Sequence, residues 1–305
     1  MAEGERGSIE TVLCATDFSE TADRALRHAT MLARRHQARL VLTHIIEPLP
    51  ADPYPMPAAL PTGEMSLREM GSQRLRQLAS EIAEPGLRVD ARLETGPPGS
   101  QLLEVAEKER AELIVLGTRG LTGFRHLVFG STAEHVVRCA RCPVLTVHPE
   151  DPEPVDAPSE VILPTDLSAD AEVAADAFLS LYGEATGARV VLTFADSTPP
   201  YLDALQHERL EEWHEPDARR EDLEGRLAPM ADRLRGRGFE VEVRIQDGGP
   251  VDVITGLAEE RGSDLIVMST HGHSALVNAL LGRTAQRVVQ HAKCPVLTVR
   301  PPRRD

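Results

Sequence analysis

Residues 112–134 read ELIVLGTRGLTGFRHLVFGSTAE, and this stretch decides how the rest of the chain is interpreted. Its first part, residues 113–116, is an apolar run that is too short for a helix and is closed by a glycine. Such a run predicts a strand buried on both faces. Gly117 and Gly120 then predict a turn where the backbone bends sharply and a ligand can approach closely.

A second glycine-bearing turn follows after nine intervening residues, at Gly130 and Ser131. Ser131 and Glu134 match a capping box, so we expect a helix to begin here. The free N–H groups and the positive dipole end of a helix start favour an anion. The two turns together predict a phosphate site. Alternatively, the glycines only mark the end of a strand and the start of a helix.

The spacing of these glycines differs from the commoner nucleotide loops. Neither Gly-x4-Gly-Lys-Ser/Thr nor Gly-x-Gly-x-x-Gly occurs anywhere in the chain. The pattern here is Gly117-x2-Gly120-x9-Gly130-Ser131.

Strand and helix patterns alternate along the first half of the chain. We expect strands at 9–15, 40–46, 88–94, 113–116 and 143–147, and helices at 19–36, 64–84 and 101–110 and from 131 onward. A proline-rich surface loop is expected at 47–61. This alternation predicts a parallel, doubly wound α/β sheet.

The same order of motifs then begins again after an acidic, proline-containing stretch. The repeats differ in position by 149 to 152 residues and pair 12–19 with 161–168, 39–43 with 189–193, 112–115 with 264–267, and 142–147 with 294–299. The chain is therefore predicted to contain two copies of one fold. We predict a first domain at 1–148, a linker at 149–159 and a second domain at 160–302.

Composition excludes several classes of function. The chain has 48 Asp and Glu against 33 Lys and Arg, a formal net charge of −15, which argues against nonspecific binding of nucleic acid or of an anionic membrane. We find no signal region and no apolar run long enough to span a bilayer, and so we expect a cytoplasmic protein. Cys139 and Cys142 form a lone Cys-x-x-Cys, which favours packing over redox chemistry.

These features together resemble the universal stress protein family, in its tandem form. Each half carries a strand-end Thr-Asp-x-Ser, a turn after the fourth strand and a final Cys-Pro-Val-Leu-Thr-Val strand. The resemblance implies two five-stranded parallel sheets flanked by helices, the adenine nucleotide alpha hydrolase-like fold. It also implies that residues 144–147 pair with 296–299 inside the chain, and it allows chains to associate as a homodimer.

The resemblance further implies an ATP site in the first half, with Mg2+. It places the adenine against the ends of the first and second strands, and the phosphates and ribose against the glycine turns. The implied ATP-binding residues are Ala15, Thr16, Asp17, Ile45, Leu116, Gly117, Arg119, Gly120, Gly130, Ser131, Thr132 and Ala133. Asp17 could instead begin the helix beside Ser19, and Arg119 could be a solvated loop residue.

The second half departs from this pattern. Ser269 replaces the first glycine, Ala275 replaces Gly123, and Arg283 replaces the serine after the last glycine. A side chain at 269 can block backbone approach, and we expect Arg283 to remove the helix cap. We therefore predict that the second half binds ATP weakly or not at all. The alternative is that Arg283 adds a hydrogen-bond donor for a phosphate. His271 and His273 lack a suitably spaced third ligand, so we expect no metal site.

The resemblance implies a nucleotide-binding protein of the stress response that acts through conformation or contacts with an unidentified regulatory partner. A rival reading is an ATP-consuming enzyme, but the motif has no lysine and only Asp17 as an acidic candidate. We therefore expect no catalytic residues. Slow hydrolysis of ATP is compatible with this expectation. A phosphoacceptor receiver domain needs an acidic cluster and a lysine near the acceptor, and this chain has neither there. An interaction scaffold that binds no nucleotide would fit the second half of the chain but not the first.

Overall fold

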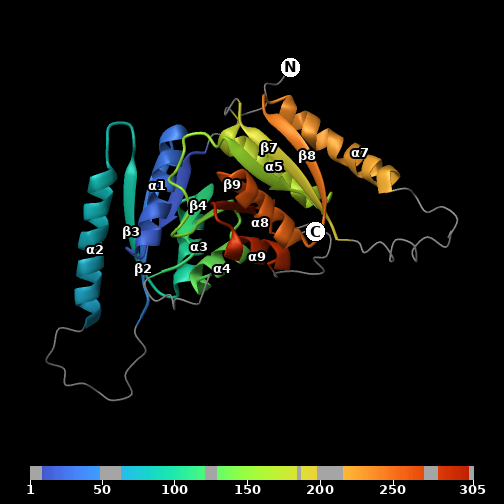
Figure 1. The fold of residues 1–305 in the computed structure, drawn as a ribbon. Helices are drawn as coiled ribbons and strands as arrows, with labels where there is room; N and C mark the ends of the chain where they lie inside the picture. The colour runs from blue at the N-terminus through green and yellow to red at the C-terminus, as the bar shows by residue number, and fades with distance from the viewer. Residues whose placement is uncertain are drawn as a thin grey trace, which may run out of the picture. The chain divides into compact units, whose positions relative to one another are not determined.

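The structure of this chain is a computed structural model that describes residues 9–48, 63–120, 129–183, 187–197, 216–270 and 281–301. The chain divides into two compact units, residues 1–156 and residues 157–305 (Figure 1). Each unit is described separately. The predicted loop at 47–61 falls mostly outside the described residues, as do Gly123, His271, His273 and Ala275.

The first unit alternates strand and helix throughout its described residues. Its strands are β1 (Thr11–Ala15), β2 (Arg39–Ile46), β3 (Val89–Thr95), β4 (Leu113–Gly117) and β5 (Val144–Val147). Its helices are α1 (Glu20–Arg35), α2 (Gly63–Ile82), α3 (Pro98–Lys108) and α4 (Ser131–Cys139). The strands run parallel in the order β3-β2-β1-β4-β5.

The second unit repeats this arrangement. Its strands are β6 (Glu160–Pro164), β7 (Arg189–Asp196), β8 (Glu240–Asp247), β9 (Leu265–Ser269) and β10 (Val296–Val299). Its helices are α5 (Ala169–Tyr182), α7 (Pro216–Arg235), α8 (Pro250–Arg261) and α9 (Arg283–His291). The strand order is β10-β9-β6-β7-β8, which corresponds to the order β5-β4-β1-β2-β3 of the first unit. These neighbouring strands pair in parallel.

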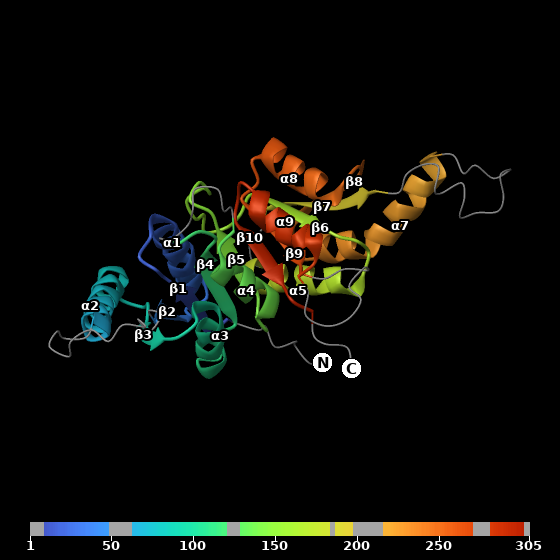
Figure 2. The ribbon, with the colours of Figure 1, turned by 90° about the horizontal axis from the view of Figure 1, so that it is seen from below.

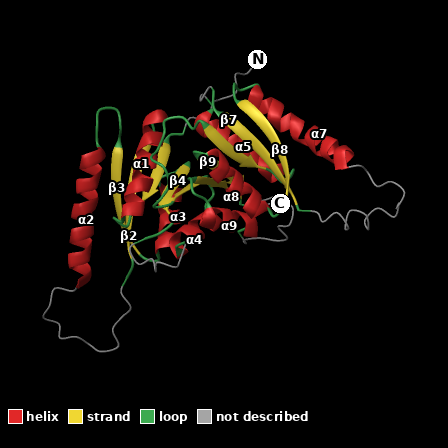
Figure 3. Cartoon of the chain, viewed as in Figure 1, coloured by secondary structure: helices red, strands yellow, loops and turns green. Residues whose placement is uncertain are grey.

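Central strands carry the core of each unit. Residues 12–14 of β1 and 113–115 of β4 are fully buried, as expected for strands covered on both faces. Helix α1 buries an alanine- and leucine-rich face, including Ala25, Ala29 and Leu32, against this sheet. Figure 3 shows helices alternating with the strands in both units. The predicted fold of two repeated α/β domains is confirmed.

A cluster of charged side chains connects the amino ends of β2 and β3 to the carboxyl end of α3. Arg39 Nη1 lies 3.0 Å from Asp90 Oδ2 and 2.8 Å from Glu109 Oε2, and Arg92 Nε donates to Glu109 Oε1 at 2.6 Å. The Arg92 guanidinium, joined by Arg39, holds the pKa of Glu109 below its ordinary value. In the second unit, Arg261 stands at the position of Glu109 and pairs instead with Glu242, at 2.7 Å.

Replacing Glu109 by glutamine is expected to lower the free energy of unfolding at pH 7 by about 1–2 kcal/mol, because two guanidinium groups lose a charged acceptor. A carboxylate whose pKa is lowered by folding stabilises the protein above its unfolded pKa, and that contribution is lost as the pH falls through the folded pKa. Urea unfolding at pH 7 and below about pH 4 measures this. A difference from wild type that persisted undiminished in acid would contradict the assignment.

Candidate functional site

The predicted site lies at the carboxyl edge of the first unit's sheet, where β1, β2 and β4 end and α4 begins (Figure 2). All twelve predicted residues are among those described. The end of β1 is tied to β2 by the Thr16 N–H, which donates to Thr43 O at 2.8 Å. The start of α4 is tied to the end of β4 by the Gly130 N–H, which donates to Thr118 O at 2.8 Å.

These hydrogen bonds bring the two predicted glycine turns together. Leu116 and Gly117 end β4, and Thr118 N also donates to Val147 O of β5, at 2.9 Å. Ile45 reaches this edge by strand register alone, because β2 extends beyond Thr43, the partner of Ala15. The edge of the sheet thus carries backbone from β1, β2, β4 and α4.

Asp17 belongs to a tight turn between β1 and α1. Thr16 Oγ1 accepts from Phe18 N at 3.0 Å, and Asp17 Oδ1 accepts from Ser19 N at 3.0 Å. Ser19 is the N-cap of α1, and its Oγ accepts from Ala22 N at 3.2 Å. One carboxylate oxygen of Asp17 therefore organises the helix start, which was the alternative to ligand binding.

The same turn recurs in the second unit. Asp166 Oδ1 accepts from Ser168 N at 3.0 Å, and Leu167 has φ 63°, close to the φ of 64° at Phe18. A left-handed conformation is uncommon for residues other than glycine, so two copies of it mark a feature of the fold. The turn alone therefore does not distinguish a binding unit from one that has lost binding.

The other oxygen of Asp17 lies against the first glycine turn. A Cβ atom built on Gly120 would be 2.5 Å from Asp17 Oδ2, and one built on Gly130 would be 3.2 Å from Thr118 O. Both positions lack room for a side chain of ordinary contact distance. Glycine at these positions lets the turn lie close to Asp17 and lets α4 begin close to β4.

Gly117 serves helix packing. A Cβ at this position would lie 2.8 Å from Thr21 Cγ2 and 3.3 Å from the Thr21 carbonyl carbon, in the first turn of α1. The glycine therefore lets α1 approach the end of β4. This contact joins two elements distant in sequence, and the spacing of the motif does not reveal it.

The capping-box prediction is wrong. Gly130 is the N-cap of α4, with extended backbone at φ −75° and ψ 147°, and as a glycine it has no side chain with which to cap the helix. Glu134 N donates to Gly130 O at 2.9 Å, so Ser131 is the first helical residue and is exposed. The first N–H groups of α4 receive no cap from the N-cap residue, and N–H groups at a helix start suit an anion.

The expected loss of a cap in the second unit is wrong for the same reason. Gly282 is the N-cap of α9, and its N–H donates to Thr270 O at 2.9 Å, matching Gly130 and Thr118. Arg283 is the first helical residue, at the position of Ser131, and it is exposed. The two units differ here in side chains and share the backbone arrangement.

Arg119 lies between the two glycines of the first turn and is half-buried. Its Nε atom is buried and has no hydrogen-bond partner among the described residues. A guanidinium with an unpaired, shielded N–H is a charge-assisted donor suited to phosphate oxygens.

Cys142 lies away from this edge, because it precedes the amino end of β5. Burial raises the pKa of the Cys142 thiol to about 12, so the reactive thiolate is scarce at neutral pH. The described residues contain no group of three or more His, Cys, Asp or Glu side chains arranged to hold a metal.

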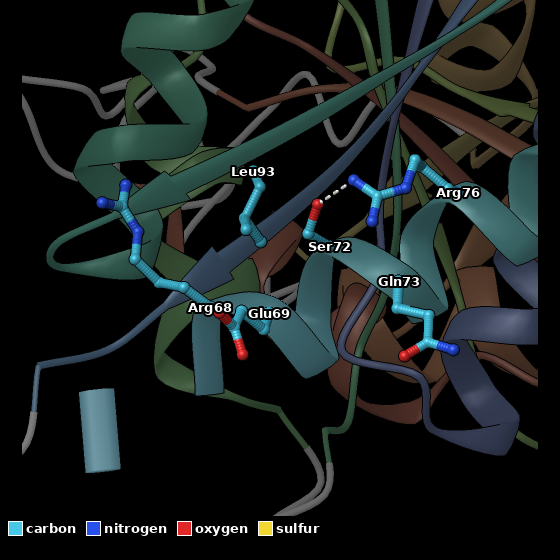
Figure 4. A pocket seen from close by; sticks show the side chains of 6 residues that line it. All are labelled: Arg68, Glu69, Ser72, Gln73, Arg76 and Leu93. Carbon is cyan, nitrogen blue, oxygen red and sulfur yellow. Dashed lines mark hydrogen bonds between the residues drawn. The ribbon is translucent and has the colours of Figure 1, made fainter. Parts of the chain in front are cut away.

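A hollow of about 670 Å³ lies elsewhere in the first unit, between α2 and β3. Figure 4 shows the residues that line it, Arg68, Glu69, Ser72, Gln73, Arg76 and Leu93. Arg76 Nη1 donates there to Ser72 Oγ at 2.5 Å. None of the predicted ATP-binding residues lines this hollow, and sequence patterns gave no signal for it.

Comparison with known proteins confirms the resemblance. The model of the universal stress protein family matches the chain twice, at residues 8–148 and 159–300. This chain belongs to the universal stress protein family. A universal stress protein of Mycolicibacterium smegmatis is 30% identical over 303 residues, covering 95% of this chain and 97% of that protein.

Other family members match one repeat or the fold alone. A universal stress protein of Thermus aquaticus is 39% identical over 144 residues, covering 46% of this chain and 98% of its own length. The crystal structure of a universal stress protein from Archaeoglobus fulgidus aligns with a TM-score of 0.67 at 20% identity, covering 95% of this chain and 96% of that one. No helix among the described residues of this universal stress protein is long and apolar enough to cross a membrane.

Proposed function

We propose that the first unit binds one ATP molecule, with Mg2+, at the carboxyl edge of its sheet. The supporting observation is the hydrogen bond from Gly130 N to Thr118 O, which holds the start of α4, with its glycine N-cap, beside the turn that contains Arg119. Backbone N–H groups at a helix start and a guanidinium suit phosphate oxygens. Ligands of open parallel sheets bind beyond the carboxyl ends of the strands.

Within this proposal, the adenine lies against Ala15, Thr16 and Ile45, and the ribose and phosphates against the glycine turns. Asp17 keeps one oxygen on the Ser19 N–H, and its second oxygen lies next to Gly120. Leu116 and Gly117 place the first turn through their position at the end of β4. Ser131, Thr132 and Ala133 present the first turn of α4.

The second unit is proposed to bind ATP weakly or not at all. Its helix start has the same backbone hydrogen bond, Gly282 N to Thr270 O. The difference lies in Ser269, where the first unit has Gly117, and in the bulk of Arg283 at the first helical position. We expect a long side chain at this position to crowd a phosphate group that approached the start of the helix.

We further propose that ATP occupancy controls conformation or contacts with a regulatory partner in the cytoplasm, as a stress-response function. Pairing of residues 144–147 with 296–299, and association into a homodimer, remain predictions within this proposal. The glycine motif contains no lysine and has only Asp17 as an acidic candidate, which favours a binding protein over a phosphoryl-transfer enzyme.

Recovery of the bound nucleotide tests binding against turnover. Nucleotide-stripped protein is incubated with ATP and Mg2+, and the nucleotides in solution and on the protein are separated by chromatography over time. We expect bound ATP to be recovered largely unhydrolysed. Metal-dependent turnover in the usual enzymatic range of about 1 to 1000 per second would overturn the proposal in favour of an ATPase.

A further inference from the structure

The segment that leaves β5 lies along α1, and Asp151 within it is buried. Asp151 is 1% exposed, and its Oδ2 accepts from His148 N at 2.7 Å. Arg24 Nη1 of α1 donates to Asp151 O at 2.5 Å, and His28 Nε2 lies 3.2 Å from Pro152 O. A segment predicted to be linker from residue 149 is thus held by specific polar contacts within the first unit.

Ion pairs continue these contacts at the surface. Arg27 makes two hydrogen bonds to Glu153, at 2.6 and 3.0 Å, and Arg24 Nη1 lies 3.1 Å from Glu153 Oε1. The Arg27 guanidinium holds the pKa of Glu153 below its ordinary value. Further along, Arg35 Nη1 donates to Asp156 O at 2.8 Å. Glu153 is largely exposed, so salt should weaken its pairs more than the buried contacts of Asp151.

The second repeat lacks the side chains that make these contacts. When Ser19 is aligned with Ser168, the positions of Arg24, Arg27 and His28 carry Val173, Asp176 and Ala177. Helix α5 covers its sheet without them. The contacts of α1 with residues 148–156 are therefore not a requirement of the fold, which points to a separate role.

One face of α1 carries contacts to both the predicted site and this segment. Thr21 packs against Gly117 at the end of β4, and Arg24 and His28 follow it at helical spacings of three and seven residues. We propose that residues 148–156 form a latch on α1, through which the helix transmits the state of the Gly117–Gly120 turn to the junction at residues 156–157. The coupling to ATP rests on the function proposed above.

Hydrogen exchange of the full chain without nucleotide tests the latch. Asp151→Ala is expected to speed exchange of the backbone amides between residues 148 and 160 by about tenfold, because the turn loses its buried acceptor. Glu153→Gln is expected to give a smaller increase that disappears at high salt. Glu150→Gln changes a neighbouring exposed carboxylate and should match wild type.

Wild-type exchange in both Asp151→Ala and Glu153→Gln would overturn the latch. If Asp151→Ala does not fold, the low-salt comparison of Glu153→Gln with Glu150→Gln decides the question.

Repeating the exchange with saturating ATP and Mg2+ tests the coupling, with saturation established by a separate titration. We expect the exchange of residues 148–160 to change on binding in the wild type and to change less in Glu153→Gln. Bound ATP without any change at these residues would overturn the coupling and leave the proposed function standing. Absence of ATP binding would overturn the function and the coupling together, while the nucleotide-free comparison still decides the latch.

Discussion

Gly117→Ala is expected to lower the free energy of unfolding by about 1–3 kcal/mol, because the added methyl group meets the first turn of α1 in a packed interior. The new Cβ would lie 2.8 Å from Thr21 Cγ2 and 3.3 Å from backbone of the same residue. Urea unfolding of the full chain, compared at equal protein concentration, measures the change. The effect should be present without any nucleotide, since it arises from packing alone.

A control variant and a double variant test whether the loss of stability comes from the contact between residue 117 and Thr21. Gly256→Ala, within α8, places a Cβ with no heavy atom within 4 Å and should be neutral or slightly stabilising. Thr21→Ala removes the nearest clashing atom, so the double variant with Gly117→Ala should lose less stability than the sum of the two single changes. Strict additivity would contradict a direct contact between Gly117 and Thr21.

Ser131→Glu is expected to weaken ATP binding by about tenfold or more, through repulsion between the new carboxylate and the phosphates. The same change should leave the fold intact, because Ser131 is exposed and caps nothing. A negative charge in the first turn of a helix is favourable by about 0.3–1 kcal/mol. The expected outcome is therefore a protein of equal or slightly greater stability that has lost affinity.

Titration calorimetry for ATP and urea unfolding together measure the two effects of Ser131→Glu. Ser131→Ala is the control, and it should retain most of the affinity because the backbone N–H groups of α4 remain. If Ser131→Glu bound ATP as tightly as wild type, the phosphates would not lie at the start of α4. Gly117→Asp is a poorer test, since it combines a charge with the clash against Thr21.

The sequence predicted the architecture because its main signals are local. Buried apolar runs such as 113–116 need only short-range pattern to be recognised, and the repeat at an offset of 149–152 residues showed that the same fold occurs twice. Helix α2 was expected at 64–84 and spans Gly63–Ile82, a small difference of the kind usual at helix ends.

The details of the site depend on contacts between distant residues, which spacing does not encode. Ser131 followed by Glu134 matched a capping box, but the N-cap is Gly130, one residue earlier, and helix α4 begins at Ser131 as expected. Gly117 was expected to lie in a turn that a ligand can approach, and spacing did not reveal that a side chain there would also meet Thr21 of α1. The contacts of residues 148–156 with α1 likewise join segments more than 100 residues apart, as Arg27 and Glu153 do.

We propose that the first repeat of this universal stress protein binds ATP and that the second binds it weakly or not at all. Calorimetric titration of the nucleotide-stripped full chain with ATP in the presence of Mg2+ tests this proposal. We expect a single saturable site, one ATP per chain. Two equivalent sites would contradict the assignment of the second unit, and no measurable binding would show that the glycine turns of the first unit serve packing alone.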